Sequence, residues 1–119
     1  MQIPNARLVA DEGEGSAMEL EHIRWTREPA PGEAALRRQL EAEGYDVVSW
    51  RDPSDRTYEA HAHPRDESLW VVHGQIVLRT GGREFALGPG DRLLLPRGTL
   101  HTAQAGPEGA LYLIGHRDD

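Results

Sequence analysis

The sequence predicts an all-β fold, a jelly-roll type of sandwich or barrel, with one short helix near the N-terminus. From residue 45 onward, short apolar runs alternate with turn-forming residues. Gly81-Gly82 is a hairpin signal, and Gly88-Pro89-Gly90-Asp91 is a second turn. Many short strands with regular turns are typical of sandwiches and barrels. The predicted strands cover residues 45–51, 57–63, 67–73, 75–80, 83–87, 91–95, 101–105 and 110–116.

The chain before this region is predicted to be an extension. We expect residues 1–44 to pack on a barrel formed by residues 45–119, and residues 17–26 to form an edge strand. Residues 11–16 are acidic and glycine-rich, which indicates a flexible turn or linker. No internal repeat is visible, so a single barrel is predicted.

The predicted helix covers residues 32–43. Pro31 lies near its start, where proline is tolerated. Leu36 and Leu40 are one turn apart and mark a buried stripe. Gly44 follows as a natural left-handed cap.

Composition excludes several classes of function. The 119 residues contain no cysteine, so disulfides, thiolate nucleophiles and zinc fingers are excluded. All 13 basic residues are arginine, which excludes Schiff-base chemistry on lysine. The net charge of −7 argues against nucleic acid as a partner. With no membrane-spanning apolar run and no signal-peptide core, we expect a cytoplasmic protein that does not bind membranes.

Three histidines and one glutamate form a candidate metal site. His61 and His63 are predicted to share one face of a strand, about 6.6–6.8 Å apart along it. Pro64 ends that strand, and a short turn can bring Glu67 back beside the histidines. His101 comes from a separate strand. Imidazole nitrogens with a carboxylate oxygen suit one divalent Zn, Mn, Fe, Ni or Cu ion per chain.

The same residues belong to two spaced motifs. At these positions the chain resembles the cupin family, whose two conserved motifs have this spacing. The motifs read His61-x-His63-x3-Glu67-x6-Gly74 and Gly90-x5-Pro96-x-Gly98-x2-His101.

The resemblance covers about residues 45–116 and implies a cupin double-stranded β-helix that binds metal. Two positions depart from the family pattern. Asp55 stands where the first motif has its initial glycine, and Ala105 stands where the second has its final asparagine. We expect Ala105 to face the barrel interior and to make the pocket more apolar. The resemblance also implies a homodimer and a small-molecule ligand.

The other polar and aromatic side chains are not predicted to bind the metal. Glu59 shares the predicted strand face of the histidines and is a candidate inward-facing acid or base. Tyr58 and Tyr112 are interpreted as packing residues. The remaining histidines are interpreted as surface residues: His22, His73 and His116.

Two function classes remain open. One is a metal-binding module that binds or senses a small polar molecule without turnover. The other is a metal-dependent enzyme, a dioxygenase or isomerase, that acts on such a molecule. Four protein ligands leave two positions of an octahedral ion open, which suits either class.

Overall fold

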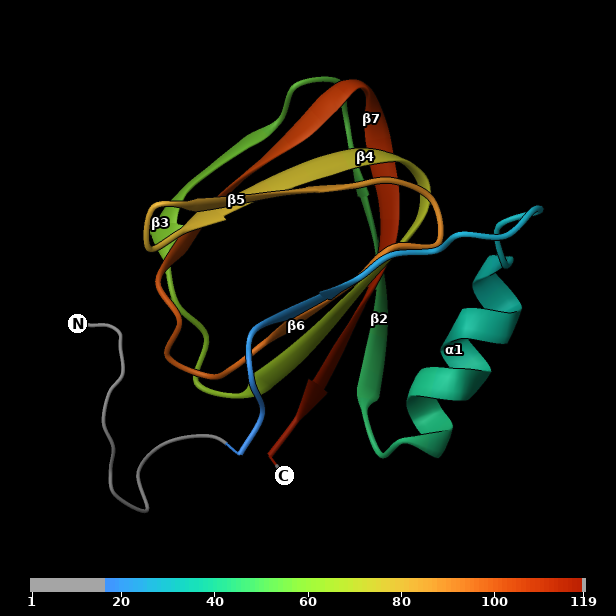
Figure 1. Cartoon of the computed structure of the whole chain (residues 1–119), viewed down its shortest axis with the longest axis horizontal. Coiled ribbons are helices and arrows are strands. Elements are labelled where there is room, and N and C mark those ends of the chain that lie inside the picture. The colour runs from blue at the N-terminus through green and yellow to red at the C-terminus, as the bar shows by residue number, and fades with distance from the viewer. Residues whose placement is uncertain (1–16, 119) are drawn as a thin grey trace.

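The computed structural model describes residues 17–118, and the predicted linker at residues 11–16 lies outside them. It contains seven strands and one helix (Figure 1). In chain order these are β1 (Glu21–Ile23), α1 (Glu33–Ala42), β2 (Asp46–Asp52), β3 (Thr57–His61), β4 (Asp66–Thr80), β5 (Arg83–Leu87), β6 (Arg92–Leu95) and β7 (His101–Arg117). The predicted all-β fold with one short helix is confirmed.

Two long strands, β4 and β7, form the frame of the sheet. They pair antiparallel along most of their length, and both bend over in Figure 1. The two halves of β7 also pair with β2 and β3, and the two halves of β4 pair with β6 and β5. Strand β1 adds to the free edge of β6. Each long strand therefore pairs with one short strand in its first half and with another in its second half, and so connects the two groups of short strands.

Residues 67–73 and 75–80 were predicted as two strands but form the single strand β4. The break predicted at Gly74 is a bend, with φ of 75° and register shifts on either side. A Cβ at Gly74 would collide with the backbone carbonyl oxygen of Gly109 on β7. Only glycine permits this close crossing of the two frame strands. Residues 101–105 and 110–116 likewise merge into β7.

The central strands β4 and β7 are covered on both sides where the helix lies. The inward face packs as one core, whose members include Leu69, Val71 and Tyr112. The opposite face of β4 and β7 packs against α1 through a second core, which includes Leu40 and Leu113. In Figure 1 the helix stands on the outer side of the sheet beside β2.

The helix occupies Glu33–Ala42, one residue shorter at each end than predicted. Leu36 and Leu40 are its buried residues, as the spacing indicated. Gly44 has φ of 91°, which makes it the predicted left-handed cap. Of the predicted edge strand at residues 17–26, only β1 is a strand.

Candidate metal centre

His61 and His101 meet at the start of β7. His61 is the last residue of β3, His101 is the first residue of β7, and the two are paired across the strands. Their ring centroids are 4.4 Å apart. His101 is only 4% exposed, whereas His61 is half-buried.

His63 joins them from a loop. Strand β3 ends at His61, two residues before the predicted end, so His63 lies between β3 and β4. The amide of Gly98, in the turn before His101, donates to the carbonyl of His63 over 2.8 Å. This bond ties the two loops together. The His63 ring lies 4.8 Å from that of His61 and 5.4 Å from that of His101.

Glu67 reaches the cluster from β4. It shares a strand face with Leu69 and Val71, which belong to the inner core, so its carboxylate is directed inward and is only 4% exposed. Glu67 Oε2 lies 3.5 Å from His63 Nε2. The four residues therefore converge at one end of the barrel, and their role as ligands stays a prediction.

The donor atoms of this cluster fit a metal ion. His61, His63 and His101 each offer a ring nitrogen, and these atoms lie within 4.8 Å of one another. His61 Nδ1 lies 2.7 Å from the carbonyl oxygen of Glu59, and His101 Nδ1 lies 2.8 Å from that of Thr99. A carbonyl only accepts, so each Nδ1 donates its hydrogen and each Nε2 keeps a lone pair. Metal-binding histidines are commonly oriented by such a bond.

The electrostatics of the cluster favour a neutral imidazole at its centre. Burial lowers the pKa of His101, and the neighbouring His61 and His63 act in the same direction. The hydrogen bond to Thr99 and the Glu67 carboxylate oppose this shift of the His101 pKa. Metal ligands must be unprotonated, so a lowered pKa of His101 reduces the competition between protons and a metal.

His116 belongs to the same region, although it was interpreted as a surface residue. Its Nε2 lies 2.9 Å from Glu67 Oε2, and its ring lies 5.9 Å from that of His63. His63, Glu67 and His116 form a second group whose donor atoms lie within 4.8 Å of one another. The strand pairing explains this, because Glu67 and His116 face each other on β4 and β7.

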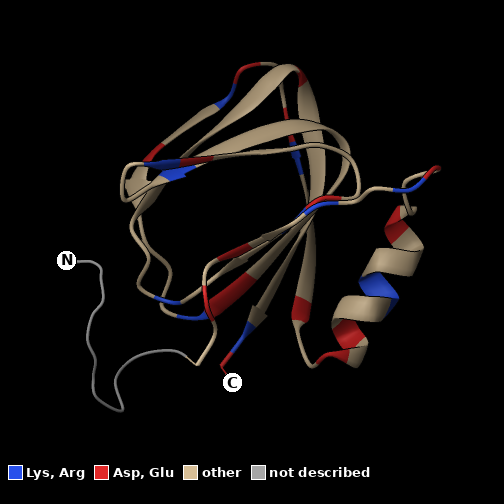
Figure 2. Ribbon diagram, viewed as in Figure 1, with Lys and Arg blue, Asp and Glu red and all other residues tan. Residues whose placement is uncertain are grey.

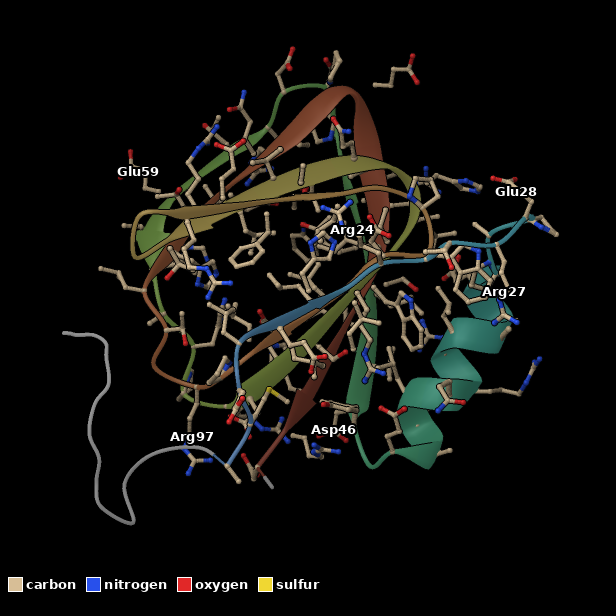
Figure 3. All side chains as sticks on the ribbon, in the orientation of Figure 1. Arg24, Arg27, Glu28, Asp46, Glu59 and Arg97 are labelled. Atoms are coloured by element: carbon tan, nitrogen blue, oxygen red, sulfur yellow. The ribbon has the colours of Figure 1, made fainter. Side chains whose placement is uncertain are left out.

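Glu59 does not face the histidines. It is exposed, and Figure 3 shows it directed away from the barrel. The pairing of β3 with β7 shifts register between Tyr58 and His61, and this bulge breaks the strict alternation of faces that the prediction assumed. Glu59 instead acts through its backbone carbonyl on His61.

A second polar cluster surrounds the buried carboxylate of Asp52. Tyr112 Oη donates to Asp52 Oδ2 over 2.7 Å, and Tyr58 Oη donates to Oδ1. Trp50 Nε1 also donates to Oδ1, over 3.0 Å. Burial, followed by the bond to Asp52, raises the pKa of both tyrosines. Tyr112 packs in the core as predicted, but these polar contacts were not predicted from the sequence.

The predictions for the other histidines, and for the two positions that depart from the family motifs, can be compared with the structure. His73 is exposed as predicted, whereas His22 is mostly buried, edge-on to Phe85. Ala105 is 2% exposed within the inner core, so the predicted inward orientation is confirmed. Asp55, at the position of a family glycine, has φ of 60°, a left-handed conformation that aspartate tolerates better than most residues.

Two of the cavities bordered by residues 17–118 differ in their relation to the histidines. The larger, about 660 Å³, lies near Tyr45, Arg92 and Arg117 and contains none of the clustered histidines. The smaller, about 270 Å³, is lined by His101 together with Arg79 and Thr80. Of these two cavities, the smaller is the one that a residue of the cluster lines, namely His101.

Charge is distributed over the whole fold. Figure 2 shows arginine segments on several elements rather than on one face, alternating with acidic segments. Figure 3 labels Arg97, which lies in the turn before His101 and is 3.9 Å from the buried Asp66. Within residues 17–118, no helix has both the length and the apolar character that a membrane crossing requires.

Comparisons with solved structures identify similar folds. A cupin superfamily protein of Desulfitobacterium hafniense is 13% identical, with a TM-score of 0.57 over 94% of this chain and 84% of that one. The DMSP lyase DddQ of Ruegeria pomeroyi is 28% identical, with a TM-score of 0.53 over 61% of this chain and 36% of that one. YcfD, a ribosomal oxygenase of Escherichia coli in complex with cobalt and succinic acid, is 23% identical, with a TM-score of 0.61 over 72% of this chain and 28% of that one.

The family comparison agrees with these structures. No curated protein matches the chain. The family model described as a cupin domain matches residues 50–114, which is more than half of the sequence and includes all four predicted ligands. The chain therefore belongs to the cupin family.

Proposed function

We propose that this cupin binds one divalent transition metal per chain through His61, His63, Glu67 and His101, and that it binds or senses a small polar molecule at the metal. The observation that carries the proposal is the hydrogen bonding of His61 and His101. Each donates Nδ1–H to a backbone carbonyl, which leaves Nε2 available beside the other donors.

A divalent metal held there would supply Lewis acidity and open coordination positions. The protein residues supply the rest of the site. The cavity beside His101 has a volume of about 270 Å³, which suits a small molecule. Arg79 and Thr80 in its lining already have partners within the chain, since Arg79 pairs with Glu84 and the Thr80 hydroxyl donates to the carbonyl oxygen of Leu100. A polar ligand would therefore be held mainly by the metal.

Metal analysis of the purified protein tests this proposal. The protein is stripped with a chelator, reloaded separately with Zn(II), Mn(II), Fe(II), Ni(II) and Cu(II), and measured by mass spectrometry of the elements. We expect about one ion per chain, and we expect the double change His61→Ala, His63→Ala to abolish binding. The matched control is His73→Ala, because His73 is an exposed histidine outside the cluster. Full occupancy in the double variant would refute the ligand assignment.

The second candidate function is a metal-dependent dioxygenase or isomerase. The similarity to a ribosomal oxygenase in complex with cobalt and succinic acid favours it, although this chain spans only 28% of that protein. Oxygen uptake by the Fe(II) form, measured with and without small carboxylates, separates the two functions. Ligand-induced thermal stabilisation without oxygen uptake or product formation supports binding or sensing.

We further propose a homodimer in the cytoplasm, with residues 1–44 as an extension of the barrel. Light scattering at tens of micromolar tests the assembly, since a monomer mass would contradict it. Partial proteolysis tests the division, because a barrel of residues 45–119 should remain intact when the chain is cut at the boundary after residue 44.

A further inference from the structure

His116 lies outside both motifs but is adjacent to Glu67. The two residues are separated by 49 positions in sequence and are directly paired in the register of β4 and β7. Paired residues on adjacent strands project to the same face. His116 therefore faces the end of the barrel where His63 and Glu67 lie, and its side chain is 27% exposed there.

The contact between His116 and Glu67 has a defined direction. His116 Nε2 and Glu67 Oε2 are 2.9 Å apart, which is a hydrogen-bond distance. A carboxylate has no hydrogen to give, so Nε2 carries the hydrogen and donates it. A ring nitrogen that carries hydrogen has no lone pair for a metal. His116 is thus oriented toward Glu67 as a donor and differs from His61 and His101, whose Nε2 atoms keep their lone pairs.

The donor atoms fall into two groups that share one residue. One group contains His61, His63 and His101, and the other contains His63, Glu67 and His116. His63 is the shared member. The Glu67 carboxylate consequently lies between two imidazoles, with His63 Nε2 at 3.5 Å and His116 Nε2 at 2.9 Å from the same oxygen.

We propose that His116 is a positioning residue that holds the Glu67 carboxylate in its orientation toward the three-histidine group. Each carboxylate oxygen has two lone pairs, so accepting one hydrogen bond from His116 leaves capacity for a metal. The inference rests on the proposed metal-binding function. It adds that the affinity of the metal site depends on a histidine that is not itself a ligand.

Three variants test the proposal through metal affinity. The dissociation constant for Zn(II) is measured by competition with a chromophoric chelator at one fixed pH. We expect His116→Ala to weaken binding by about 10–100-fold, the usual effect of losing a partner that orients a ligand. His116→Gln should restore much of the affinity, because its amide nitrogen can replace Nε2–H as the donor. His73→Ala, the exposed control, should bind as the wild type does.

A double-mutant cycle separates positioning from a general structural effect. If His116 acts through Glu67, His116→Ala should cause little further loss of affinity in a Glu67→Ala background. Equal losses in both backgrounds would overturn the proposal. The cycle remains informative if single variants lose stability, because it compares backgrounds.

Spectroscopy separates positioning from direct ligation. Pulsed electron paramagnetic resonance of the Cu(II) form reports the coordinated imidazoles, and we expect the same number in wild type and in His116→Ala. A loss of one imidazole would identify His116 as a ligand and overturn the proposal. Wild-type affinity in His116→Ala would also overturn it. A wild-type protein that binds no metal would instead refute the proposed function itself.

Discussion

Replacing Tyr112 with phenylalanine tests how strongly the buried carboxylate of Asp52 depends on its phenol partners. The Tyr112 hydroxyl donates to Asp52 Oδ2 over 2.7 Å, and the side chains are 4% and 3% exposed. The donors Tyr58 and Trp50 bond the other oxygen, Oδ1, so they do not replace the lost bond. A hydrogen bond to a charged group contributes about 1.5–3 kcal/mol to the free energy of unfolding.

The expected loss at neutral pH is therefore about 1.5–3 kcal/mol. For a domain of this size, that corresponds to a fall in Tm of roughly 6–12 °C. The assay is urea unfolding followed by tryptophan fluorescence, together with a thermal scan. Tyr45→Phe is the matched control, since Tyr45 is equally buried but its ring packs against Arg92 and Arg117.

The free energy of unfolding at alkaline pH provides a second test of Tyr112→Phe. Burial and the bond to Asp52 raise the pKa of Tyr112, so the folded protein keeps the proton above pH 10, where an unfolded tyrosine releases it. The contribution of Tyr112 is thus fully present below about pH 10 and is lost as the pH rises further, by about 1.4 kcal/mol per pH unit. The difference between wild type and Tyr112→Phe should narrow from pH 10 to 11. A difference below about 0.5 kcal/mol at pH 7, or one that stays constant to pH 11, would refute the reasoning.

Three further predictions concern the metal, the inner core and the strand crossing. Metal-loaded wild type should melt at a higher temperature than the apoprotein, with about 2.7 kcal/mol added when free metal is 100 times the dissociation constant. The double change His61→Ala, His63→Ala should remove this gain in calorimetry. Ala105→Asn should leave metal content unchanged but lower stability by about 1–3 kcal/mol, because it places an amide in an apolar core; loss of metal would show that residue 105 contacts the ligands. Gly74→Ala should destabilise the fold by more than about 1 kcal/mol, because its Cβ would collide with β7, and an unchanged urea midpoint would contradict the crossing.

The local features of the site were predictable from the sequence. His61 and His63 are two positions apart, and Pro64 ends the strand beside them. The turn Pro96-Arg97-Gly98 fixes where His101 begins the next strand. Such short-range relations are determined by the geometry of strands and turns. The helix stripe and its glycine cap were predictable for the same reason. That His101 would join His61 and His63 was implied by the resemblance to the two cupin motifs.

Features that depend on strand irregularity were not predictable. The alternation of side chains placed Glu59 with the histidines, but a bulge in β3 turned it outward. The turn expected at Gly74 is a bend inside a continuous strand, because β7 crosses close to it. Both outcomes depend on the partner strand, which the local sequence does not specify.

The sequence by itself determined the all-β class, the single helix and the convergence of His61, His63 and His101. Only the tertiary structure decided the partners of Glu67 and Asp52. His116 meets Glu67 across 49 positions, and Tyr112 meets Asp52 across 60. The second half of β7 is buried on both faces, by the inner core and by the helix, so its apolar pattern does not reveal which face His116 and Tyr112 share. The register between distant strands decides it, because a shift of one residue would reverse every side chain on β7.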